Sequence, residues 1–141
     1  MQADSVPRRQ PRILIKRAYE PPAAEDGQRV LVDRLWPRGI SKARIQIDFW
    51  ARELAPSTEL RKWFNHDPAR WEEFQRRYRA ELEAPEHAVL LDDLAARART
   101  QPMTLLYGAR DTEHNEAVVL QDLLEQQQRP RPAPRKRART G

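Results

Sequence analysis

The sequence predicts a single α/β domain, in which a largely parallel sheet is flanked by helices and lies between two disordered tails. Short apolar runs of strand type alternate with longer helical stretches, which is typical of parallel sheets covered by helices. The 141 residues suffice for one hydrophobic core and little more. Both ends are polar and rich in proline or arginine, so they cannot bury apolar surface. We therefore expect tails at 1–11 and 127–141 around a domain at 12–126.

Three apolar runs predict strands. They are residues 13–15, residues 30–35 and residues 103–107, the last of which stops at Gly108. The segment 45–54 stays open, because its apolar residues alternate as in a strand while a helix over 43–55 fits equally well.

Helices follow from caps and from apolar spacing. Ser57 is the expected N-cap of a short helix, and Asp67 caps a longer one whose first turn accepts Pro68. Further helices are expected over about 86–99 and from near Thr112 to about 126. The inward stripes of the four helices contain Leu60, Trp63 and Phe64; Trp71, Phe74, Tyr78 and Leu82; Leu90, Leu91, Leu94 and Ala98; and Ala117, Leu120, Leu123 and Leu124.

Composition excludes several classes of site. The chain has no cysteine, which excludes disulfides, thiolate nucleophiles, zinc ribbons and iron–sulfur clusters. It has only 4 glycines and no glycine-rich phosphate loop, which argues against dinucleotide binding of the usual kind. Its 3 histidines lack metal-ligand spacing, so neither a metal nor a cofactor is expected. Without a signal peptide or an apolar span, we expect a cytoplasmic protein that does not enter membranes.

The positive net charge belongs to the tails. The chain carries +5 overall, but residues 129–141 hold six cations and no acid, and residues 1–10 hold two cations and one acid. Residues 11–128 keep 18 cations against 20 acids, a net charge of −2. A domain that follows a phosphate backbone is normally basic itself. Any nucleic-acid binding is therefore expected in the C-terminal tail.

The loop after the second expected strand predicts a binding site. Arg34, Trp36 and Arg38 combine two guanidinium groups, which match phosphate or carboxylate, with an indole that stacks on planar groups. Pro37 and Gly39 make this loop stiff and sharply turned. The structural alternative places Trp36 in the core and pairs the arginines with Asp33, Asp48 or Glu53.

A second loop lies where residues 103–107 lead into the last helix. Free N–H groups at a helix start favour an anion, and Arg110, His114 and Asn115 add to that preference. His114 is the best acid/base candidate if the protein is an enzyme, because imidazole titrates near neutral pH, and Tyr107 could assist it. The alternative assigns Asp111 or Thr112 as a plain N-cap.

A third cluster contains Ser57, Arg61, Trp63 and His66. N-capping already accounts for Ser57, and the alternative for His66 is that it simply ends the preceding helix. Arg61 and His66 remain candidate ligand-binding residues.

Several of these segments resemble the YeaO-like branch of a bacterial domain-of-unknown-function family. The resemblance covers residues 12–126 in order and rests on these motifs: Lys16-Arg17-Ala18-Tyr19, residues 31–39, Leu54-Ala55-Pro56-Ser57, residues 60–64, His66-Asp67-Pro68, residues 105–111, and His114-Asn115. It implies a compact α/β domain and no particular reaction. The wider family often carries cysteines in the region of residues 107–115. This chain has Tyr107 and His114-Asn115 there and no cysteine, so a thiol mechanism of such relatives is excluded for it.

Both unusual loops, 33–42 and 107–115, follow strands. Because ligands bind outside the carboxyl ends of parallel strands, we expect the two loops to face one crevice. Our first hypothesis is an Arg/His/Trp-lined pocket for a small phosphate- or nucleotide-like anion, with the reaction unknown. The second is a non-catalytic nucleic-acid accessory protein that binds through its basic tail.

Overall fold

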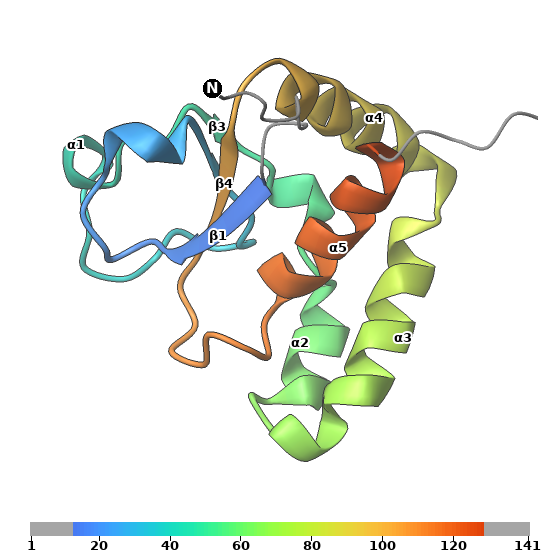
Figure 1. Ribbon diagram of the computed structural model, residues 1–141. Coiled ribbons are helices and arrows are strands. Elements are labelled where there is room, and N and C mark those ends of the chain that lie inside the picture. Colours follow the sequence, from blue (N-terminus) through green and yellow to red (C-terminus); the bar gives the residue numbers. More distant parts are fainter. Residues whose placement is uncertain (1–12, 129–141) are drawn as a thin grey trace, which may run out of the picture.

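The computed structural model describes residues 13–128 and shows one α/β domain (Figure 1). Its strands are β1 (Ile13–Arg17), β2 (Gln28–Leu31), β3 (Phe49–Trp50) and β4 (Met103–Tyr107). Its α-helices are α1 (Lys42–Ile45), α2 (Thr58–Phe64), α3 (Trp71–Leu82), α4 (Pro85–Thr100) and α5 (Glu116–Gln128). Three 3₁₀ turns span Ala24–Asp26, Arg52–Leu54 and Pro68–Arg70. The tails expected at 1–11 and over most of 127–141 lie outside the described residues.

The four strands form one parallel sheet in the order β1-β4-β2-β3. The predicted parallel α/β architecture is therefore confirmed. Helices α2 to α5 gather on one side of the sheet and α1 lies on the other (Figure 1). Strand β4 occupies the middle of the sheet, and each of its five residues is buried.

Alternation along the strands creates two cores. Val30 and Leu105 face the main core with the long helices, whereas Leu31 and Leu106 face a smaller core with Ile45 of α1. Because successive strand residues point to opposite faces, neighbouring apolar residues serve both cores. This explains why β4 reads as a continuous apolar run and not as an alternating one.

The second strand is shorter than predicted. It ends at Leu31, and the backbone leaves the sheet after Val32, whose N–H still donates to the carbonyl of Leu106 at 3.0 Å. Asp33 then turns its carboxylate toward the next loop, so Leu35 lies in the loop and not in the strand. The open segment 45–54 resolves into pieces of both kinds, since the end of α1, the short β3 and a 3₁₀ turn follow one another there.

The caps predicted for α2 and for the segment that leads into α3 are confirmed. The Ser57 hydroxyl accepts from the N–H of Leu60 at 3.1 Å, and the Asp67 carboxylate accepts from the N–H of Ala69 at 3.0 Å. Asp67 caps the 3₁₀ turn at Pro68–Arg70, and α3 continues directly from it.

The start predicted for the last helix is wrong. Asp111 accepts from the N–H groups of Glu113 and His114, which makes a turn and not a helix cap. Asn115 caps α5 instead, because its side-chain oxygen accepts from Ala117 N at 2.9 Å. The helix also continues to Gln128, whose amide donates to the carbonyl of Ala95, so residues 127 and 128 belong to the domain.

A buried ion pair fastens the amino end of the sheet. The Asp26 carboxylate, 3% exposed, pairs with Arg29, and the ammonium of Lys16 reaches it at 3.0 Å. Burial alone would raise the pKa of Asp26. Hydrogen bonds from the Ala23 N–H and from the two cations outweigh that effect and hold the pKa below its ordinary value.

Candidate anion-binding site

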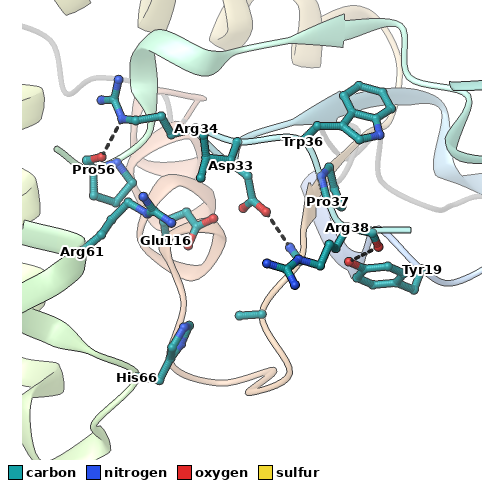
Figure 2. A pocket seen from close by; sticks show the side chains of 13 residues that line it. Tyr19, Asp33, Arg34, Trp36, Pro37, Arg38, Pro56, Arg61, His66 and Glu116 are labelled. Carbon is teal, nitrogen blue, oxygen red and sulfur yellow. Dashed lines mark hydrogen bonds between the residues drawn. The ribbon is translucent and has the colours of Figure 1, made fainter. Parts of the chain in front are cut away.

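Two loops meet where β2 and β4 end. The Asp33 carboxylate accepts a hydrogen bond from the backbone N–H of Gly108 at 2.9 Å, which ties the loop after β2 to the loop after β4 (Figure 2). A Cβ atom at position 108 would lie 2.9 Å from that carboxylate, so a larger residue there would force the Asp33 side chain to shift. The junction lies at the carboxyl ends of neighbouring parallel strands, which is the usual ligand position in such sheets.

A cavity of about 240 Å³ opens at this junction. It is lined by residues of both loops, of α2 and of the start of α5: Tyr19, Asp33, Arg34, Leu35, Trp36, Pro37, Arg38, Pro56, Arg61, His66, Gly108, Ala109 and Glu116. The expected meeting of the segments 33–42 and 107–115 is therefore present in the structure.

Three arginines line this cavity. Arg34 donates to the carbonyls of Ala55 and Pro56, at 3.2 Å each, which positions its guanidinium beside the start of α2 (Figure 2). Arg38 and Arg61 are exposed. Within residues 13–128, the ion pairs of the structure include none of these three arginines. The alternative in which Arg34 and Arg38 pair with neighbouring acids is thus not what the structure shows.

The rim of the cavity is aromatic and apolar. Trp36 donates its indole N–H to the carbonyl of Ile40 at 2.6 Å and packs edge-on against Trp50, with ring centroids 5.4 Å apart. It therefore belongs to the smaller core and lines the cavity as well. Tyr19 donates its hydroxyl to the carbonyl of Arg38, and Leu35 is 63% exposed beside it. A planar or apolar group of a ligand would find contact here.

A carboxyl pair lies among the arginines, and the sequence analysis missed it. Glu116, the first residue of α5, lines the same cavity as Asp33. Burial raises the pKa of Glu116, and the charge of Asp33 raises the pKa further, well above the ordinary range; Arg61 opposes the shift only in part. Glu116 therefore binds its proton more tightly than an exposed glutamate does.

A second cavity of about 70 Å³ adjoins the first. The two share Pro56, Arg61, His66, Ala109 and Glu116, and the smaller one adds Phe64, Phe74, His114 and Asn115. The His114 Nδ1 lies 2.8 Å from the Asp111 carboxylate, and its ring packs edge-on against Trp71. Hydrogen bonds from the Glu113 N–H and from the His114 ring hold the pKa of Asp111 below its ordinary value.

His66 is held beside both cavities by an unusual backbone. Asn65, the C-cap of α2, has φ 48°, and His66 itself has φ 53°. Two successive non-glycine residues in the left-handed region are uncommon, and such conformations concentrate at functional sites. This observation adds weight to His66, which the sequence analysis had also read simply as a helix end.

The predicted site residues separate into four groups. Arg34, Trp36 and Arg38 line the larger cavity, and Arg61 and His66 line both. His114 and Asn115 line the smaller one, where Asn115 also serves as the α5 cap. Arg110 is exposed and Tyr107 is buried, and neither lines either cavity. Burial also raises the pKa of Tyr107, which makes it a poorer acid/base group.

Asp33 and Glu116 carry a sequence signal that could have identified them. Asp33 lies just beyond one strand, and Glu116 opens the helix that follows the neighbouring strand. An acid in the first turn of a helix is ordinarily explained by the helix dipole. It becomes informative only when the strand order β4-β2 brings the two positions together.

The fold and the site define a class of protein: a small parallel α/β domain with an arginine-lined cavity at the carboxyl edge of its sheet. A family model described as "Inactive DUF488-N3 subclade" matches residues 12–139. The chain belongs to this DUF488-N3 subclade, and its resemblance to YeaO-like proteins is confirmed.

Two curated relatives match this chain over almost their whole length. The uncharacterized protein YeaO of Escherichia coli (strain K12) is 47% identical over 112 residues, covering 79% of this chain and 96% of the relative. The uncharacterized protein Mb3100c of Mycobacterium bovis is 40% identical over 116 residues, covering 82% of this chain and 96% of the relative. No solved structure matches the chain. Among residues 13–128, no helix is long and apolar enough to span a bilayer.

Proposed function

We propose that this chain is a binding domain, without a reaction of its own, for a small phosphate-bearing ligand held in the arginine-lined cavity. The observation that carries the proposal is the convergence of Arg34, Arg38 and Arg61 on one cavity, none of them in an ion pair within residues 13–128. A guanidinium presents a planar fork of N–H donors that matches the oxygens of a phosphate.

The charge balance of the cavity supports an anion. Three arginines line the cavity together with two carboxyls, those of Asp33 and Glu116, and the raised pKa of Glu116 disfavours its negative charge. The cavity is therefore cationic although residues 11–128 as a whole are slightly acidic. Arg34 is only partly exposed to water, so solvent screens its field less than the fields of the exposed Arg38 and Arg61.

The size and rim of the cavity limit the ligand. A volume of about 240 Å³ is below the roughly 300–1,000 Å³ of pockets that enclose drug-sized molecules. The rim of Trp36, Tyr19 and Leu35 can contact a short carbon chain or one edge of a ring. These features favour a monophosphate with a small organic body.

Two observations favour binding without catalysis. The family model that matches the chain describes an inactive subclade, and the chain lacks the cysteine that the wider family often carries near residues 107–115. Tyr107 lines neither cavity. His114, oriented by Asp111, remains the group to test for acid/base chemistry, because its ring borders the smaller cavity.

The test is a titration with ribose 5-phosphate followed by amide chemical shifts and by calorimetry. Shifts are expected in residues 33–38 and 108–116. Arg61→Ala and Arg34→Ala should each weaken binding about tenfold or more, because each removes a charge-assisted contact. Arg76→Ala is the matched control, since Arg76 is an exposed arginine on α3 that pairs with Glu73 and lines neither cavity.

Two results would contradict the proposal. One is the absence of any saturable shift at millimolar ligand. The other is equal binding by the cavity variants and the control. Turnover of the ligand by the wild type, lost in His114→Ala, would overturn the non-catalytic part alone.

The composition of the C-terminal tail favours a second function, nucleic-acid binding. Residues 129–141 lie outside the described residues, but they hold six cations and no acid. Six released counterions would give a log–log salt slope of up to about −5 on duplex DNA. A chain truncated after Gln128 should lose this binding, and retention of it would locate the DNA contact in the domain.

A further inference from the structure

The cavity contains hydrogen-bond acceptors as well as cations. The Asp33 carboxylate accepts from the Gly108 N–H at 2.9 Å. An ionised carboxylate has about four acceptor positions, so about three remain on Asp33 after this bond. The oxygens of the Glu116 carboxyl add further acceptor capacity. Both side chains line the larger cavity (Figure 2).

Charged and titratable groups surround the pair. Arg34, Arg38, Arg61 and His66 line the same cavity. The charge of Arg61 lowers the pKa of Glu116, which offsets only in part the effects of burial and of Asp33. His114 and Glu116 both line the smaller cavity. The arginines are cations, so they stabilise negative charge on the pair.

A ligand that only accepts hydrogen bonds leaves the pair unused. A simple alkyl phosphate would meet the arginines with its oxygens and would place its carbon chain against the carboxyl oxygens. Buried acceptors that lose water without gaining a donor are costly, so such a ligand binds less tightly than one that supplies donors.

We propose that the Asp33–Glu116 pair selects a phosphate ester that carries hydroxyl groups, the arginines holding its phosphate while the carboxyl oxygens accept from its hydroxyls. This inference rests on the proposed function, because it names the ligand class of the same cavity. The ligand is then a small polyol or sugar phosphate. A neutral hydroxyl suits the position better than an ammonium group, because an ammonium would lie beside the guanidinium of Arg61.

The experiment compares two probes that differ only in their hydroxyls. Glycerol 3-phosphate and propyl phosphate have the same chain length and the same charge, but propyl phosphate has no hydroxyl. The wild type should bind glycerol 3-phosphate about tenfold or more tightly, as measured by calorimetry at pH 7. A third probe, 2-aminoethyl phosphate, should bind no more tightly than glycerol 3-phosphate.

Variants of the pair should abolish the preference between the probes. Asp33→Asn keeps an oxygen for the Gly108 N–H but replaces acceptor positions with an N–H₂ donor, and Glu116→Gln changes the second member in the same way. In each variant the ratio of the two affinities should fall toward one. Glu113→Gln is the control, because Glu113 is an exposed acid in the same loop that lines neither cavity. The affinity ratio is insensitive to a general loosening of the site, which would weaken both probes together.

The outcomes separate the two proposals. Equal binding of the two probes by the wild type overturns the hydroxyl selection and leaves the anion site standing. Preference for glycerol 3-phosphate that survives in both Asp33→Asn and Glu116→Gln overturns the role of the pair. Binding of 2-aminoethyl phosphate more tightly than glycerol 3-phosphate would show that the pair prefers an ammonium to a hydroxyl, and it also overturns the inference. Failure of all three probes to bind overturns the proposed function and the inference with it.

Discussion

Tyr78→Phe should destabilise the domain far more than its single missing oxygen suggests. Tyr78 of α3 is fully buried and donates its hydroxyl to the carbonyl of Leu54. Phenylalanine fills the same space, so the loss of apolar burial is negligible. The Leu54 carbonyl, however, is left buried without a donor. The expected cost is about 1–3 kcal/mol in the free energy of unfolding.

The same bond supports a wall of the cavity. Leu54 directly precedes Ala55 and Pro56, whose carbonyls accept from Arg34. Freeing the Leu54 carbonyl should therefore loosen the position of Arg34 and weaken phosphate binding. A variant that loses stability but keeps full affinity would show that the wall is held by other contacts.

Urea unfolding at pH 7 measures the stability effect. With a slope of about 2 kcal/mol/M, the midpoint should fall by about 0.5–1.5 M with the slope unchanged. Tyr19→Phe is the matched control, because Tyr19 also donates its hydroxyl to a backbone carbonyl, that of Arg38, but at the surface where water can replace it. A loss below about 0.5 kcal/mol in Tyr78→Phe, or an equal loss in both variants, would refute the reasoning.

Three further outcomes are expected. Asp26 has a lowered pKa, so its stabilising effect is present above the unfolded pKa of about 3.9 and is lost as pH falls through the still lower folded pKa. Asp26→Asn leaves a buried cation without its partner, so it should cost roughly 3–5 kcal/mol at pH 7. The unfolding free energy of this variant, measured in urea, should also depend less on pH in the acidic range. Glu116 has a raised pKa, so its contribution to stability is full below about pH 4.3 and is lost as pH rises through the folded pKa. Glu116→Gln should therefore be at least as stable as the wild type at pH 8. A parallel decline in the unfolding free energy of both proteins with rising pH would contradict this. Gly27→Ala should prevent folding or lower the melting temperature strongly, because the φ of Gly27 is +63° and a Cβ would lie 2.2 Å from the carbonyl oxygen of Pro102. Gly39→Ala is the control: Gly39 has φ +76° but nothing within 4 Å of a Cβ, so this change should cost only about 1 kcal/mol of backbone strain.

Features that depend on residues close in the chain were predictable. The Ser57 cap reaches an N–H three residues ahead, and the Asp67-Pro68 start works within one turn. The parallel sheet also followed from the sequence, because β4 must be apolar on both faces when helices cover one side and α1 the other. A cap finds its hydrogen-bond partner within a few residues, and a strand buried on both faces requires only apolar surroundings, so both can be predicted from the sequence.

The same local reasoning misplaced the last helix start. Asp111 and Thr112 are both acceptable caps by residue type, and so is Asn115. The Asp111 carboxylate is hydrogen-bonded to the N–H groups of Glu113 and His114 and to the His114 ring, so it stabilises a turn and the helix begins only after Asn115. Competing hydrogen bonds of similar strength are not ranked by sequence, because each differs by only a fraction of a kcal/mol.

The sequence by itself determined the candidate residues for an anion site: Arg34, Arg38, Arg61, His66 and Arg110 stood out because their side chains can hold a negative charge. Only the tertiary structure decided which of the candidates share a cavity, leaving Arg110 outside it and bringing Glu116 against Asp33. The physical reason is the strand order. Inserting β4 beside β2 joins the carboxyl ends of segments far apart in the chain, and the charge, burial and proton affinity of Glu116 exist only after that pairing has formed.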